Sequence, residues 1–137
     1  MQPTDIRLHK KSGILELRYA QEVVHHLPAE FLRVLSPSAE VRGHGQGQEV
    51  LQTGKRHVLI NTLEAIGHYG LKLHFSDGHN TGIYTWEYLY ELGENQDPLW
   101  QDYLAKLKAA GAKREALAEG VQVVNIMPLN QPRGSAG

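Results

Sequence analysis

Two short stretches of this chain alternate apolar and polar residues, and they constrain its fold more than any other feature. They lie at residues 14–19 and 70–75. Their alternating apolar members are Leu15, Leu17, Tyr19, Leu71, Leu73 and Phe75. A period of two places such side chains on one face of a β-strand and the intervening polar side chains on the other. The pattern therefore predicts half-buried strands of a small antiparallel sheet.

Turn signals separate these strands from further strand-like segments. Residues 10–13 form a polar loop that ends in glycine, which adopts a positive φ at little cost. The dipeptide Asp77-Gly78 is a strong hairpin signal. The further strands are expected at residues 5–9, 22–27, 58–66 and 81–84.

Three segments show the spacing and end signals of helices. Residues 29–35 are typical of one short amphipathic helix. Thr85 is suited to cap a second helix, and Gly93 stands where the end of that helix is expected. The third and longest helix is predicted to open with Asp97 as its N-cap and Pro98 in its first turn.

The third helix carries a single apolar stripe, which implies a single docking surface on the sheet or on a partner. The stripe consists of Leu99, Trp100, Tyr103, Leu104 and Leu107. Together these elements predict an α+β fold: a small antiparallel β-sheet domain with short helices, plus a C-terminal amphipathic helix.

The same patterns divide the chain into three parts. We expect a domain at residues 1–93, a helical C-terminal extension at 94–127 and a disordered tail at 128–137. Within the extension, Val121 to Met127 is apolar enough for an edge strand or a docking peptide. Unpaired edge strands in a small sheet are compatible with a monomer or a homodimer.

The charge and cysteine content exclude several classes of protein. The 137 residues include eight histidines and no cysteine, so disulfides, thiolate nucleophiles and Fe–S ligation are excluded. The 14 lysines and arginines balance 15 aspartates and glutamates, which argues against nucleic-acid binding. No apolar run approaches the ~18 residues of a membrane span. The first residues are too polar for a signal peptide, and we expect a cytoplasmic protein.

The common catalytic and cofactor motifs do not occur in the chain. The glycine cluster at residues 43–47 fails the dinucleotide template, because Gln48 stands where glycine is needed. No HExxH motif is present, and the serines lie outside the contexts that activate a nucleophile. The cluster belongs to a glycine-rich stretch, residues 36–55, and long loops of this kind are usually functional or mobile.

The densest group of polar and aromatic residues lies at 76–86, and here the chain resembles a known family. Residues 3–93 resemble the gamma-butyrobetaine hydroxylase-like N-terminal domain. The matching segments are PTDIRLHKKSGILELRYA, LPAEFLRVLSPSAEVRGHG and, most specifically, HYGLKLHFSDGHNTGIYTWEYLYELG. The resemblance implies a small α+β domain without the iron and 2-oxoglutarate residues, which belong to a separate catalytic domain of the hydroxylases.

The resemblance also implies a zinc site, which in the hydroxylases is built from three cysteines and one histidine. The cysteine positions fall here on Ser36, Ser38 and Val41, while the histidine matches His79. Because a hydroxyl is a poor zinc ligand and valine is none, the thiolate site is lost. No cofactor is therefore expected, and a weak zinc or iron site with His79, His44 and water or carboxylate ligands is the alternative.

Three functional hypotheses follow. The first is a non-catalytic interaction or adaptor domain with a protein partner, linked by analogy with fused relatives to Fe–S or quinone biosynthesis. Its surface is expected to combine the 36–55 loop with Asp77, Tyr84, Trp86, Trp100 and Tyr103. The second is a metal-binding module that uses His44 and His79. The third is a small-molecule enzyme with Asp77 and His79 as an acid/base pair.

Overall fold

The computed structural model describes residues 1–43 and 47–116, and these fold into two three-stranded antiparallel sheets with several helices. The first sheet has the order β1-β2-β3 and the second the order β4-β5-β6. The strands are β1 (Asp5–His9), β2 (Ile14–Arg18), β3 (Val24–Pro28), β4 (Ile60–Ile66), β5 (Gly70–Phe75) and β6 (Ile83–Thr85). The predicted α+β class is confirmed, although the strands form two sheets rather than one.

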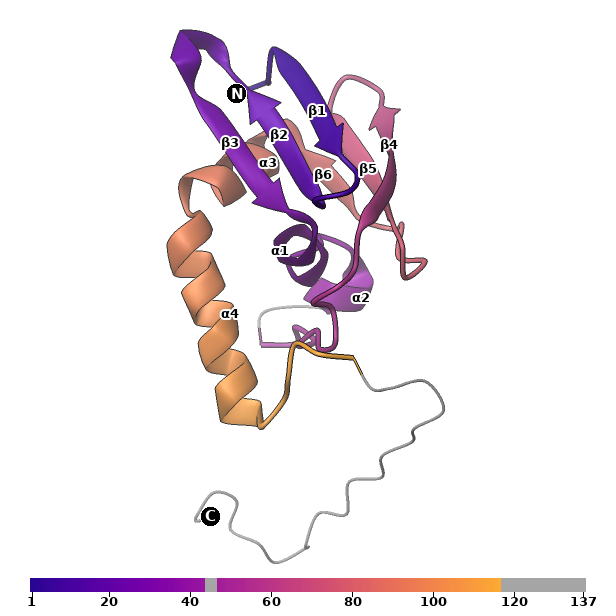
Figure 1. Ribbon diagram of the computed structural model, residues 1–137, viewed down its shortest axis with the longest axis vertical. Helices are drawn as coiled ribbons and strands as arrows, with labels where there is room; N and C mark the ends of the chain where they lie inside the picture. The colour runs from indigo at the N-terminus through magenta and orange to yellow at the C-terminus, as the bar shows by residue number, and fades with distance from the viewer. Residues whose placement is uncertain (44–46, 117–137) are drawn as a thin grey trace, which may run out of the picture.

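The helices join and cover these sheets. They are the 3₁₀ turn η1 (Ala20–Glu22) and the α-helices α1 (Ala29–Val34), α2 (Ala39–Arg42), α3 (Trp86–Glu94) and α4 (Gln96–Ala110). In Figure 1 the two sheets stand next to each other with β1 beside β4, and α1 and α2 lie below them. α2 falls within the stretch predicted as a loop, because four residues are too few to show a helical period.

The alternating residues of β2 and β5 point into one shared core. Leu15 and Leu17 are fully buried, and Leu73 is 1% exposed. α1 adds Phe31 and Leu32 to the same cluster, and α3 adds further apolar side chains. The period-two pattern therefore identified the central strand of each sheet.

The junction between α3 and α4 differs from the prediction. Thr85 caps α3 as expected, since its hydroxyl accepts a hydrogen bond of 3.1 Å from the Tyr88 amide. Gly93, however, lies inside α3 rather than after it. A Cβ at Gly93 would lie 2.1 Å from Nδ1 of His25, so this glycine permits close packing of α3 on β3. The α4 helix begins at Gln96 with Asn95 as its N-cap, and the predicted cap at Asp97 is wrong.

α4 docks on its own domain through its apolar stripe. Trp100 packs against Phe31 at a ring-centroid distance of 6.3 Å, and Tyr103 is buried. Gly111 ends the helix in a left-handed conformation, with a φ of 66°. The chain then returns past residues 54–56, where the Gly54 amide donates a hydrogen bond of 3.0 Å to the Lys113 carbonyl. The expectations for residues 121–127 and 128–137 fall outside the described residues.

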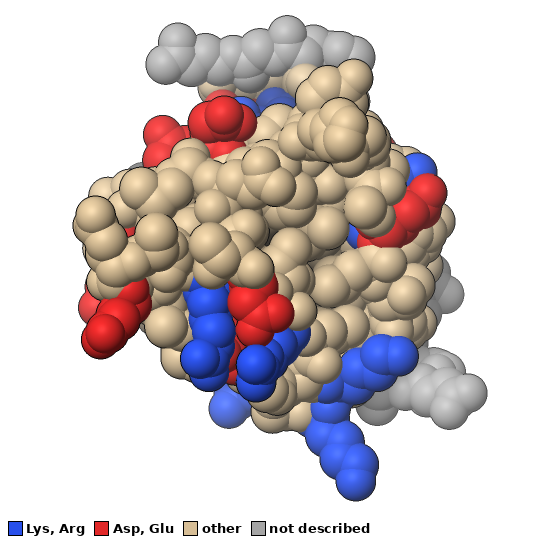
Figure 2. Space-filling model, turned by 90° about the horizontal axis from the view of Figure 1, so that it is seen from above, with Lys and Arg blue, Asp and Glu red and all other residues tan. Residues whose placement is uncertain are grey.

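The surface carries both signs of charge. Figure 2 shows acidic and basic side chains near one another on the face seen from above, without a patch of one sign. This face lacks the basic excess that a nucleic-acid footprint requires. Within residues 1–43 and 47–116, no helix is both long and apolar enough to cross a membrane.

Candidate functional site

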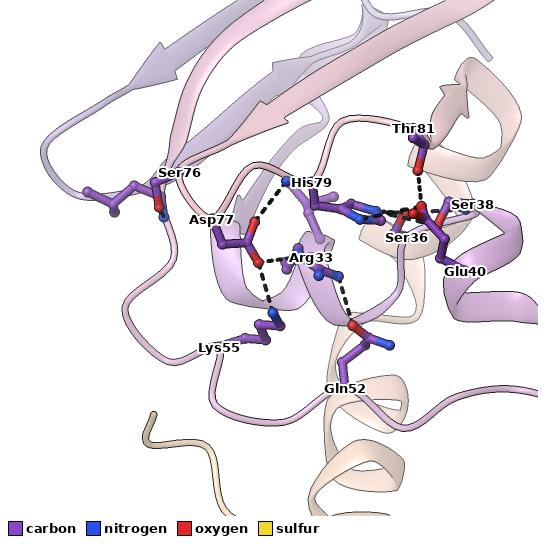
Figure 3. Close-up of polar contacts among 12 residues, drawn as sticks. Arg33, Ser36, Ser38, Glu40, Gln52, Lys55, Ser76, Asp77, His79 and Thr81 are labelled. Carbon is purple, nitrogen blue, oxygen red and sulfur yellow. Dashed lines mark hydrogen bonds and ion pairs between the residues drawn. The ribbon is translucent and has the colours of Figure 1, made fainter. Parts of the chain in front are cut away.

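Two clusters of polar side chains form where residues 29–42, which we call the α1–α2 segment, meet the turn between β5 and β6. We call the first the histidine cluster; it contains Ser36, Ser38, Glu40, His79 and Thr81. The second, the aspartate cluster, contains Arg33, Gln52, Lys55 and Asp77. Figure 3 shows both clusters and the Asp77-to-Thr81 turn that connects them. Segments more than 40 residues apart in sequence are thus held together by polar contacts.

His79 is the centre of the histidine cluster. Its Nε2 atom lies 2.8 Å from Oγ of Ser36 and 3.4 Å from Oγ of Ser38. Its Nδ1 atom faces a carboxylate oxygen of Glu40 at 3.8 Å, which favours the tautomer protonated at Nδ1. In that tautomer Nε2 accepts a hydrogen bond from a serine hydroxyl. Burial, assisted by the charge of Arg33, lowers the pKa of His79 and favours the neutral ring.

The two serines are held by the backbone around Pro37. Pro37 stops α1, and the Ser38 amide then donates a hydrogen bond of 3.3 Å to Oγ of Ser36. Ser36 is 1% exposed and Ser38 5%. A Cβ at Gly82 would lie 2.5 Å from Oγ of Ser36, so the residue before β6 packs tightly against the cluster. The Ser36 hydroxyl therefore lies between the Ser38 amide and Gly82.

Asp77 is the centre of the aspartate cluster. Arg33 Nε and Lys55 Nζ each donate to one carboxylate oxygen at 2.9 Å, and the His79 amide donates to the other at 3.2 Å. Burial alone would raise the pKa of Asp77, but the hydrogen bonds from Lys55, the His79 amide and Arg33 outweigh it and hold the pKa at about 2. Arg33 is itself 6% exposed, so this ion pair lies largely within the protein.

The residues at the family's ligand positions do not fit a zinc ion. The 2.8 Å between Ser36 and His79 is an ordinary hydrogen-bond distance, and Val41 is a buried apolar side chain. Among the residues that the structure describes, no group of three or more His, Cys, Asp or Glu side chains could hold a metal ion. His44 lies outside the described residues, so its pairing with His79 stays a prediction.

The expected acid/base pair is not formed. Asp77 contacts the backbone amide of His79, whereas the imidazole ring points toward Ser36 and Ser38 (Figure 3). A serine beside a histidine is the arrangement of many hydrolases, but a nucleophile must reach its substrate. The Ser36 hydroxyl belongs to a residue that is 1% exposed. The hydrogen bonds of the cluster connect the α1–α2 segment with the β5–β6 turn.

An apolar groove lies on the other side of the α1–α2 segment. Its volume is about 380 Å³. It is lined by Val34, Leu35, Val41, Arg42, Glu49, Val50, Leu51, Gln52, Leu99, Asp102, Tyr103 and Lys106. A second pocket of about 370 Å³ shares Leu35, Arg42 and Leu99 with it and extends it toward α3. Val50 is 53% exposed, so part of the apolar lining is open to solvent.

Contacts between α4 and the extended segment at residues 49–52 create this groove. The Tyr103 hydroxyl donates a hydrogen bond of 2.8 Å to the Gln52 carbonyl and fixes the distance between the two walls. The sequence predicted one surface that combines the 36–55 loop with Trp100 and Tyr103 of α4, but it did not predict the groove between them. The spacing of Val50 and Leu51 after the glycine cluster gives no periodic signal that could have shown this.

The residues predicted for the interaction surface differ in their exposure to solvent. Tyr84 is fully buried, and its hydroxyl donates a hydrogen bond to the Leu32 carbonyl, so its assignment to an interaction surface is wrong. Tyr103 is 5% exposed and lines the groove. Trp86 and Trp100 are partly buried; the Trp86 indole donates to the His68 carbonyl at 2.8 Å. Asp77 is held in its own cluster.

Comparisons with known proteins agree with this fold. One solution NMR structure is 51% identical in sequence, covers 90% of this chain and 98% of its own, and superposes with a TM-score of 0.75. A second NMR structure is 46% identical, with coverages of 90% and 93% and a TM-score of 0.71. A crystal structure from Acidithiobacillus ferrooxidans, of a protein of unknown function in the DUF971 family, is 42% identical, with coverages of 67% and 92% and a TM-score of 0.57. None of the curated proteins matches the chain.

The family itself is identified by a match over most of the folded part. Residues 6–90 match the family described as "Gamma-butyrobetaine hydroxylase-like, N-terminal", which spans both sheets and ends within α3. The resemblance seen in the sequence is thereby confirmed. The chain belongs to the family of gamma-butyrobetaine hydroxylase-like N-terminal domains.

Proposed function

We propose that this chain is a non-catalytic cytoplasmic protein-binding domain whose partner docks in the apolar groove between α4 and residues 49–52. The observation that carries the proposal is the groove itself, which has a volume of about 380 Å³, an apolar lining and the exposed side chain of Val50. Exposed apolar surface rimmed by polar residues is typical of interaction sites. By analogy with its fused relatives, we expect the partner among proteins of Fe–S or quinone biosynthesis.

The rim of the groove suits an amphipathic partner segment. Arg42 and Lys106 supply positive charge, while Glu49 and Asp102 supply negative charge. An apolar centre with a charged rim of both signs is the usual anatomy of a protein interface. A partner helix with apolar residues at i, i+3 and i+4 and charged flanks would match this arrangement.

The histidine cluster supports a non-catalytic role. The ring and the serines form hydrogen bonds with one another, and the Ser36 hydroxyl is covered by Gly82, just before β6. The Asp77 carboxylate is likewise engaged by Arg33 and Lys55. Both clusters therefore act within the fold, where they join the α1–α2 segment to the β5–β6 turn.

Site-specific cross-linking in cells tests the proposal. A photoreactive amino acid replaces Val50 in the groove or, as the matched control, Tyr69, which is 67% exposed and lies in the β4–β5 turn. We expect one reproducible protein cross-linked from position 50 and not from position 69, and loss of that product when Leu51→Asp is added. Identical products from both positions, or none from position 50, would contradict the proposal.

A further inference from the structure

We propose that the chain's own segment from Val121 to Met127 occupies the apolar groove in the free protein. This inference rests on the proposed function of the groove and deepens it, because it names the group that an external partner must displace. The segment lies beyond the described residues, which end at Ala116.

The described chain ends close to the groove. The Gly54 amide bonds to the Lys113 carbonyl, and a Cβ at Gly54 would lie 3.3 Å from Cα of Ala116. Gln52, two residues before Gly54, is part of the groove lining, and two residues span at most ~7 Å. Residues 117–120 can cover up to ~14 Å when extended. Val121 is therefore within reach of the groove.

The composition of the segment matches the groove rather than the solvent. Its sequence, VQVVNIM, contains three valines, one isoleucine and one methionine, and no charged residue. The groove offers complementary apolar side chains from three elements: Val34 of α1, Val41 of α2 and Leu99 of α4. Because the segment is uncharged, the four charged residues of the rim could stay in water while the apolar centre is covered.

The surrounding contacts already hold the returning chain against the domain. Arg114 donates two hydrogen bonds to Glu30, at 2.8 and 2.7 Å, and its guanidinium lies 5.1 Å from the Trp100 ring centroid. Arg56 binds Glu115 at 2.6 Å. These contacts fix residues 114–115 beside the domain and raise the effective concentration of the following segment at the groove.

A spin label tests the proposal on the full-length protein. The chain contains no cysteine, so Asn125→Cys provides a single attachment site, and Ser135→Cys in the tail provides the matched control. With the label at position 125 we expect loss of the amide NMR signals of Leu51, Tyr103 and Lys106. With the label at position 135 these signals should persist, and in the Asn125→Cys chain Val123→Asp with Val124→Asp should restore them.

The alternatives give distinct outcomes. Intact groove signals with the label at position 125 overturn the proposal. In a mixture of spin-labelled chains and isotope-labelled, spin-free chains, loss of the same groove signals also overturns the proposal, because the segment of a second copy then fills the groove. The measurement uses purified protein alone. If the segment occupies the groove but position 50 captures no partner even after Val123→Asp and Val124→Asp, the proposed function fails and this inference stands.

Discussion

The histidine cluster and the apolar groove share the α1–α2 segment. They differ in whether their side chains have partners within the described fold. Arg33 and Ser36 face the polar clusters, whereas Val34 and Leu35 face the groove. On the polar side each named group has partners from a distant loop. On the apolar side the lining surrounds a space of about 380 Å³. Neighbouring residues thus face polar partners within the fold on one side and line the groove on the other.

This difference predicts how substitutions should act. Removing a group from either polar cluster leaves its buried partners without hydrogen bonds and lowers the free energy of unfolding. Changing an exposed side chain at the groove leaves the folded state almost unaffected and acts on binding.

Gly82→Ala should destabilise the protein most. The added Cβ would lie 2.5 Å from Oγ of Ser36 and 3.0 Å from Cδ of Pro37, so either the histidine cluster or the backbone at Gly82 must shift. Overpacking of this kind costs about 3 kcal/mol of unfolding free energy. Chemical denaturation measures the loss. The control is Gly78→Ala, which has open space but a φ of +90°, and should lose only about 1 kcal/mol. Equal losses would show that the cluster is not tightly packed.

Asp77→Asn should cause the second-largest loss of unfolding free energy. It leaves the buried Arg33 guanidinium without a carboxylate, and we expect a loss of about 2 kcal/mol, less than for a fully buried pair because Asp77 is 22% exposed. The control is Asp102→Asn at the groove, where the partner Lys106 is 63% exposed and the loss should stay under about 0.5 kcal/mol.

The Asp77 contribution also has a defined pH range in the wild type. Because the folded-state pKa is about 2 and the ordinary value is 3.8, the carboxylate is stabilised by folding. The contribution should be complete above pH 3.8 and disappear as the pH falls toward 2. Asp77→Asn should flatten this part of the stability curve, and an unchanged curve would contradict the assigned ion pair.

Much of the fold could be predicted from the sequence because its strands are locally encoded. The alternation in β2 and β5 and the Asp77-Gly78 turn are short-range signals, and the Thr85 cap acts within one helical turn. Gly93 shows the limit of such signals. A glycine at the end of a helical pattern indicates a C-cap, and only the long-range contact with His25 explains why it lies inside α3.

The candidate site was predictable in part of its membership and not in its geometry, because Arg33, Glu40 and Lys55 joined it without a signal in the sequence. The resemblance aligned Ser36, Ser38 and His79, and the structure brings them together. The burial of Tyr84 was not predictable, because a tyrosine in a three-residue strand is equally compatible with either face. The groove arises from contacts of Tyr103 with Gln52, 51 residues apart, which no local pattern records.

His79→Gln should change the pH dependence of stability by a smaller amount. Since folding lowers the pKa of His79 below its ordinary 6.5, the unfolded chain binds a proton first as the pH falls. The wild type should therefore lose stability below pH 6.5 until the folded-state pKa is passed. The glutamine keeps a side-chain hydrogen bond to the serines but does not titrate, so this loss should shrink. Chemical denaturation of both proteins at a series of pH values measures the difference, and an undiminished loss in His79→Gln would contradict the assigned role of His79.

Val50→Glu should have the smallest effect on stability, within about 0.5 kcal/mol, because a side chain that is 53% exposed contributes little burial energy. Denaturation curves of this variant and of Tyr69→Glu, exposed by 67%, should nearly coincide with the wild type. Val50→Glu should nevertheless weaken occupancy of the groove, since a carboxylate there would be removed from water by any apolar occupant. A loss comparable to that of Asp77→Asn would mean that the groove is a closed part of the core, and the contrast with the polar clusters would fail.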